Sequence, residues 1–217
     1  PVLVLKDAGG NVVTGDSSST VTVNLTTASG AALSGATTVT VLNGAAVFTD
    51  LKVDKIGTYT LSPVSSLAEV SETDSNSFTI SVGSAVTLEW QTQPGNGTGG
   101  TAISQQPALV LKDAGGNTVT GDNGSTVTVS LTTPGTATLS GTKTVAVQNG
   151  IATFTDLKVD KIGTYTLSPI SSLAGVTETD SAAFTISEGS AVSLEWQTQP
   201  GNGTGGTVLA QQPVLVL

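Results

Sequence analysis

One sixteen-residue stretch, FTDLKVDKIGTYTLSP, occurs twice in this chain without a change, as residues 48–63 and 154–169. The sequence around it repeats too: LEWQTQPGNGTGGT begins at both Leu88 and Leu194. PVLVL at Pro1 returns as PALVL at Pro107, and a third copy of the repeat begins with PVLVL at Pro213. Both pairs lie 106 residues apart (154 − 48; 194 − 88), without a gap. Solenoid units are shorter, roughly 20–50 residues, whereas one β-sandwich domain has about this length. The sequence therefore predicts a row of similar domains, each with its own core.

The composition predicts an all-β fold. Charged residues make up only 11% of the 217-residue chain, against about 25% in an average soluble protein. Val and Thr dominate, Gly and Pro punctuate the sequence, and no long stretch shows the apolar spacing of an amphipathic helix. The second copy contains seven to eight short strand-like segments at the spacing of a sandwich. We expect strands within residues 106–113, 125–133, 137–139, 144–148, 151–159, 164–169, 177–186 and 191–197.

Charge and residue usage argue against several functional classes. The net charge is −9, with seven Lys and no Arg, so a nucleic acid partner is not expected. No apolar run is long enough to insert into a membrane. The chain has no Cys and no His, and the GNGTGG loop at residues 95–100 lacks the Lys of a phosphate-binding loop. We therefore expect no catalytic residues, no cofactor and no enzymatic activity.

The repeated KIGTYTL segment resembles the corner of an immunoglobulin-like domain, in which a Tyr packs beneath the turn before its strand. Tyr59 and Tyr165 would be the corner tyrosines. Together with DAGGN and the NGxAxFTDL segment, the pattern resembles bacterial immunoglobulin-like tandem repeats. Such repeats occur in giant cell-surface adhesins, invasin-like proteins, and secreted filament or S-layer proteins. The resemblance covers essentially the whole chain and implies tandem immunoglobulin-like β-sandwich domains of a prokaryotic extracellular or cell-surface protein.

The same resemblance implies where the domains begin, because the LEWQTQP strand usually opens a domain in such repeats. Residues 1–83 would then be a repeat without its first strand, residues 84–187 a complete repeat, and residues 188–217 the first strands of a following one. We expect sequence before Pro1 in the native protein. Two accounts remain open: the chain is a window on a longer repeating polypeptide, or its last strand completes the first domain of another copy.

Two groups of polar residues are candidate sites. Asp and Asn recur in the turns of both copies; they either bind calcium, as in many adhesin junctions, or simply form turns. Four Asn-x-Ser/Thr sequons permit N-glycosylation, and the two in the GNGT loops are the best placed. The calcium candidates are Asp7, Asn11, Asp16, Asp113, Asn117 and Asp122, and the glycosylation candidates are Asn96 and Asn202. Trp90 and Trp196 could stack on sugars, but their alternation with Val and Leu favours packing in a core.

The leading functional expectation is a structural segment of a long extracellular stalk or filament, assembled head to tail. Its partners would be adjacent repeats and other copies of the same protein. The alternative is an adhesin module whose loops bind a glycan or a host surface protein. A third alternative is an accessory domain of a secreted enzyme.

Overall fold

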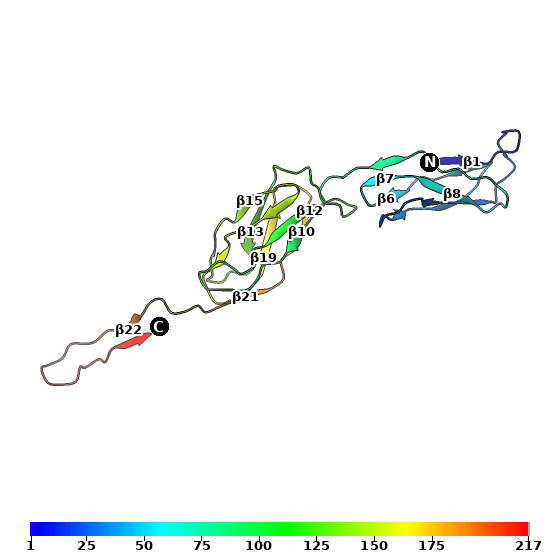
Figure 1. The fold of residues 1–217 in the computed structure, drawn as a ribbon. Helices are drawn as coiled ribbons and strands as arrows, with labels where there is room; N and C mark the ends of the chain where they lie inside the picture. The colour runs from blue at the N-terminus through cyan, green and yellow to red at the C-terminus, as the bar shows by residue number, and fades with distance from the viewer. Residues whose placement is uncertain (217) are drawn as a thin grey trace.

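The computed structural model describes residues 1–216, and every regular element in that range is a β-strand (Figure 1). This confirms the predicted all-β class. The strands form two bodies and a terminal hairpin. The N-terminal body contains β1 (Val2–Val4), β2 (Thr20–Leu25), β3 (Leu33–Ser34), β4 (Thr38–Thr40), β5 (Ala45–Val47), β6 (Lys52–Val53), β7 (Gly57–Tyr59), β8 (Leu61–Ser65) and β9 (Phe78–Ile80).

The central body begins with β10, which is followed by a long loop containing the short strand β11. Its strands are β10 (Thr87–Thr92), β11 (Gly97–Thr98), β12 (Ala108–Lys112), β13 (Thr126–Leu131), β14 (Leu139–Ser140), β15 (Thr144–Ala146), β16 (Ile151–Thr153), β17 (Lys158–Val159), β18 (Gly163–Tyr165), β19 (Leu167–Ser171), β20 (Thr177–Glu178) and β21 (Phe184–Ser187). The C-terminal hairpin pairs β22 (Glu195–Thr198) with β23 (Val214–Val216).

Strand alternation explains the pairing of the longest strands. In β13, Val127 and Val129 point into the core, while Thr128 faces outward, where its hydroxyl is 2.8 Å from that of Thr144 on β15. Strand β13 pairs with β15 on one side and with β19 on the other, and β2 pairs in the same way with β4 and β8. A one-residue shift in either ladder would turn the valines outward, so the alternation fixes the register.

Each body has its own hydrophobic core. The cluster in the central body includes Phe154, Leu157, Leu167 and Ile186, which are almost fully buried. The cluster in the N-terminal body is smaller and centres on Val23, Val41 and Phe48.

Strand β10 and the loop after it account for the larger central core. Strand β10 lies between β12 and β20 in a four-stranded sheet, and β11 pairs with β21 on another sheet. From these positions they bury Leu88 and Ile103. In the N-terminal body, β1 pairs only with β5. On its other side, facing residues 71–73, no strand within residues 1–216 occupies the position that β10 has in the central body.

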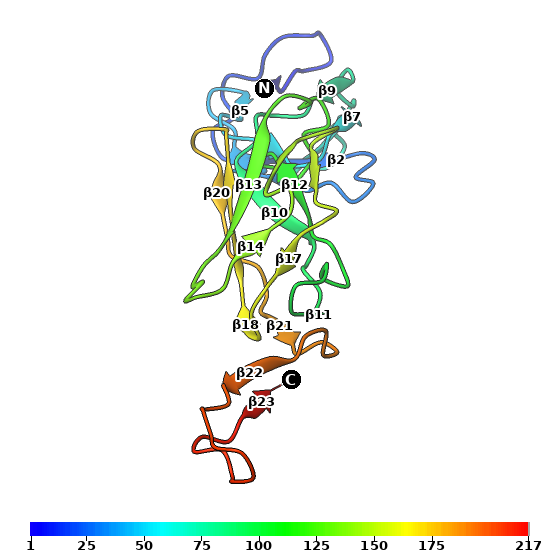
Figure 2. The same ribbon diagram turned by 90° about the vertical axis from the view of Figure 1, so that its left-hand side faces the viewer.

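The two bodies and the hairpin follow one another in a row, with the hairpin at the far end of the central body from the N-terminal body (Figures 1 and 2). Within residues 1–216 we find no helix long and apolar enough to cross a membrane.

Candidate functional site: the joint between the two bodies

Both tyrosines lie beneath a sharp turn. Tyr165 is 8% exposed, and its hydroxyl donates to the carbonyl oxygens of Lys161 (3.1 Å) and Ile162 (3.2 Å). Tyr59 is 6% exposed and makes the same bonds to Lys55 (3.0 Å) and Ile56 (3.3 Å). We call residues 54–57 and 160–163 the first and second corner.

Glycine is required at the end of each corner, where the tyrosine ring passes close to the backbone. A Cβ on Gly163 would lie 2.8 Å from the Tyr165 hydroxyl oxygen, and a Cβ on Gly57 would lie equally close to that of Tyr59. The tyrosine bonds hold the corner backbone from below, so its outer surface has a fixed shape.

The DAGGN segment forms a compact turn that its own side chains stabilise. Oδ1 of Asp113 accepts hydrogen bonds from the backbone N–H groups of Gly115 and Asn117, both at 2.9 Å. Asp7 makes the equivalent bonds to Gly9 (2.9 Å) and Asn11 (2.8 Å) in the N-terminal body. The turn therefore forms with or without a neighbouring body. We call residues 113–117 the joint turn and residues 7–11 the free turn.

The first corner contacts the joint turn directly. The Asn117 side chain donates from Nδ2 to the carbonyl oxygen of Asp54 (2.8 Å) and accepts at Oδ1 from the N–H of Ile56 (3.2 Å). The Lys55 ammonium donates to the carbonyl oxygen of Gly115 (2.8 Å). One amide side chain thus satisfies both a donor and an acceptor of the corner backbone. Both bonds can form at once only in a particular orientation of the two bodies.

Two further features tighten this contact. An added Cβ on Gly115 would lie 1.9 Å from the carbonyl oxygen of Asp54, so any side chain there would push the bodies apart. The N–H of Gly83, in the connection between β9 and β10, donates to Oδ2 of Asp113 (2.9 Å). The connection and the corner are therefore both attached to the same turn.

Asp113 remains ionised although it is buried. Burial alone would raise the pKa of its carboxyl group, but hydrogen bonds from Gly83, Asn117 and Gly115 outweigh it and lower the pKa to about 2. The pKa of the Asp7 carboxyl is also lowered, first by its hydrogen bonds from Asn11. The negative charge of Asp113 is therefore part of the folded joint at neutral pH.

The structure brings together only some of the predicted calcium candidates. Asp113 and Asn117 share the joint turn, and Asp7 and Asn11 share the free turn. Asp16 and Asp122 instead bond to Ser19 and Ser125 at the start of the next strand. Residues 1–216 contain no cluster of three or more acidic, His or Cys side chains suited to a metal. Calcium binding here stays a prediction.

The remaining candidate residues lie elsewhere. Asn96 is exposed, and its Oδ1 accepts a hydrogen bond from the N–H of Thr185 (2.8 Å); Asn202 is exposed in the hairpin loop. Glycosylation at either residue stays a prediction. Trp90 packs partly against the central core and donates to the carbonyl oxygen of Thr179 (2.9 Å). Trp196 is 48% exposed, so its expected burial in a core is wrong for this copy: the hairpin has no body to pack against.

The joint is not among the features that the sequence predicts. Asn117 is a turn or calcium candidate by its sequence, and no local pattern pairs it with the corner. The only signal available was that DAGGN and DKIG occur unchanged in both copies.

No protein-family model and no curated protein matches the chain. A solved structure of a glycosyl hydrolase family 2 member from Bacteroides cellulosilyticus is similar, with a TM-score of 0.40 and 12% identity over 78% of this chain and 22% of that chain. The prediction that this chain is not an enzyme is corrected by this finding and is not carried further. At this TM-score the likeness assigns neither an activity nor a site to this chain.

Proposed function

We propose that this chain is a structural segment of a long extracellular stalk or filament, built from immunoglobulin-like β-sandwich repeats joined head to tail. The observation that carries the proposal is the joint. Its first corner and joint turn are bound by three direct hydrogen bonds, and Gly115 allows their close contact. A short connection and a specific contact of this kind give stiff coupling between domains, in contrast to a flexible linker.

Both halves of the joint are also present at the two ends of the row. The free turn repeats the joint turn, and the second corner repeats the first corner residue for residue. Ile162 of the second corner is 65% exposed, compared with 50% for Ile56 in the first. A further repeat at either end could therefore make the same joint, as a stalk of many repeats requires.

Small-angle X-ray scattering from the dilute chain tests this proposal. A stiff row predicts a pair-distance distribution with a long, well-defined maximum dimension, reproduced by one arrangement of the bodies. A distribution that requires many arrangements would contradict it. Binding of the chain to a glycan array would instead favour the adhesin alternative.

A further inference from the structure

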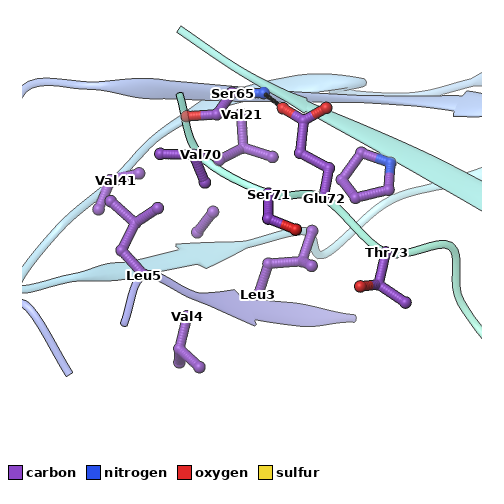
Figure 3. Close-up of a pocket in the computed structure, with 12 residues that line it drawn as sticks. Leu3, Val4, Leu5, Val21, Val41, Ser65, Val70, Ser71, Glu72 and Thr73 are labelled. Atoms are coloured by element: carbon purple, nitrogen blue, oxygen red, sulfur yellow. Dashed lines mark hydrogen bonds between the residues drawn. The ribbon is translucent and has the colours of Figure 1, made fainter. Parts of the chain in front are cut away.

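The N-terminal body carries an apolar groove between β1 and residues 70–73 (Figure 3). Leu3 and Leu5 line one side, Val70 lies on the other, and Val21 and Val41 form part of the floor. The residues of the groove have identical or similar counterparts 106 positions later in the central body. There, β10 lies between β12 and β20, the strand positions that correspond to the two sides of the groove.

Burial differs between the bodies at identical residues. Leu109, Leu111, Leu157 and Leu167 are 0% exposed in the central body. Their counterparts Leu3, Leu5, Leu51 and Leu61 are all only half-buried in the N-terminal body. Residues 87–106 account for the difference, since Leu88, Trp90 and Ile103 pack against the central cluster. The groove thus fits a segment with the sequence pattern of residues 87–106.

The C-terminal hairpin of the same chain has that pattern. Leu194, Trp196 and Leu209 correspond to Leu88, Trp90 and Ile103, and all three are at least 38% exposed in the hairpin. The hairpin lies beyond the central body from the groove, so it cannot reach the groove of its own chain in this arrangement (Figure 1). We propose that the C-terminal hairpin of one copy of this chain docks in the N-terminal groove of a second copy.

The central body supplies a template for the polar contacts of this docking. Trp90 donates to the Thr179 carbonyl oxygen, and Gln93 accepts at Oε1 from the Ala182 N–H (2.9 Å). Gln106 accepts from the Leu157 N–H (2.9 Å). By the same pattern, we expect three bonds in the docked pair: Trp196 with the Thr73 carbonyl, Gln199 with the Asn76 N–H and Gln212 with the Leu51 N–H.

Docking would replace the backbone hydrogen bonds between β22 and β23 by equivalent bonds between β22 and β1 of the second copy. In the hairpin, Trp196 pairs with Leu215 in the register in which Trp90 pairs with Leu109. Residues 213–217, PVLVL, are identical to residues 1–5. On docking, β22 would exchange β23 of its own chain for β1 of the second copy. The gain is the burial of Leu194, Trp196 and Leu209, which the free hairpin leaves exposed.

The joint extends this contact. Docking would bring the second corner of one copy next to the free turn of the other, where Asn11 would take the place of Asn117. Because the two docking surfaces lie at opposite ends, the contact is heterologous and adds copies in an open chain. This inference deepens the proposed function by naming the partner as a second copy of this chain.

Sedimentation velocity of the 217-residue chain tests the proposal. We expect a concentration-dependent series of linear oligomers, and a chain that ends at Gln212 should assemble at least as tightly because no competing strand remains. Leu194→Asp should weaken assembly by more than about tenfold, since a charge would enter the apolar groove. Its control is Glu195→Gln, whose counterpart Glu89 is exposed, and it should assemble normally. Only monomer at every concentration would overturn the proposal.

Two groove variants separate docking from non-specific aggregation. Val70→Lys places a charge in the groove and should block assembly, whereas Val64→Lys, at a residue 49% exposed on β8 and outside the groove, should not. Each mutated residue is exposed in the free chain, so the bodies should still fold, which circular dichroism checks. Mixing Leu194→Asp with Val70→Lys should give a dimer and nothing larger, because only one hairpin and one groove remain intact. Equal effects of Val70→Lys and Val64→Lys, or no dimer in the mixture, would overturn the groove as the docking site.

Docking between copies and stiffness of the joint can be measured separately. The stiffness of the joint is measured within one chain, with the monomeric Leu194→Asp variant. A stiff monomer that never assembles would overturn docking alone, and a flexible chain that assembles would overturn the stalk.

Discussion

The side-chain amide of Asn117 donates a hydrogen bond of 2.8 Å to the backbone carbonyl oxygen of Asp54, 63 residues earlier in the chain. The other end of the same amide accepts from the N–H of Ile56. This pair joins the first corner to the joint turn, and it holds the orientation of the two bodies together with the hydrogen bonds from Lys55 to Gly115 and from Gly83 to Asp113.

Replacing Asn117 by Ala should loosen the joint and leave both bodies folded. Its hydrogen bonds to the corner are worth about 0.5–1.5 kcal/mol each, so we expect hydrogen exchange at the Ile56 and Gly83 amides to quicken by about tenfold or more. Nuclear magnetic resonance measures both amides. Asn11→Ala, in the free turn, is the matched control and should leave them unchanged. Unchanged protection in Asn117→Ala would show that the amide does not hold the joint.

Acid should release the joint between about pH 4 and pH 2. The Asp113 carboxyl has a folded pKa of about 2, below its ordinary value of 3.8. The unfolded or released state therefore binds more protons in this window, and the stabilisation is complete above pH 4 and is lost as the pH falls through 2. Exchange at the Gly83 amide, measured through this range and corrected for intrinsic rates, follows the release. Asp113→Asn should abolish the pH dependence, and an unaltered profile in that variant would assign it to another group.

Removing one corner hydroxyl should destabilise the central body. Tyr165→Phe leaves the carbonyl oxygens of Lys161 and Ile162 without their buried donor, at a cost of about 1–3 kcal/mol. Urea unfolding monitored by tryptophan fluorescence detects this, because Trp90 belongs to the central body. Thr164→Ala, at an exposed position of β18, should cost far less. Equal stability of Tyr165→Phe and the parent chain would refute the corner as a source of stability.

Truncating equivalent leucines in the two bodies should lower the free energy of unfolding by different amounts. Leu157 is 0% exposed, and we expect Leu157→Ala to cost about 2–5 kcal/mol. Leu51, its counterpart in the N-terminal body, is half-buried. Leu51→Ala should therefore lower the free energy of unfolding of that body by clearly less. Urea unfolding followed by amide signals of each body separates the two effects. Equal costs would mean that residues 87–106 do not complete the central core.

The sequence predicts those features of the fold that depend on the pattern of neighbouring residues. The alternation of Val and Thr within residues 125–133 predicted the strand that the structure contains as β13, and Val127 and Val129 on one face of that strand are buried. The pattern of β10 also predicted burial of the matching β22, yet Leu194 and Trp196 are exposed. Burial depends on whether a body lies beneath the strand, and alternation alone carries no information about that.

The joint could not be predicted because it depends on contacts between distant parts of the chain. Asp and Asn in DAGGN have a sufficient local explanation as turn formers. Nothing in the sequence of Asn117 shows that its amide reaches Asp54. The parallel pairs of β10 with β20 and of β11 with β21 also join distant parts of the chain, so the sequence did not predict them. Each pair involves only two residues per strand, which is too short to leave a sequence pattern.

The most direct test of the stiff joint is a distance distribution across it. The chain has no Cys, so spin labels on Thr58→Cys and Thr120→Cys report one pair, with Leu194→Asp included to keep the chain monomeric. Double electron–electron resonance should give one narrow distance peak that broadens when Asn117→Ala is added. A broad distribution in the chain with Asn117 intact would contradict the account.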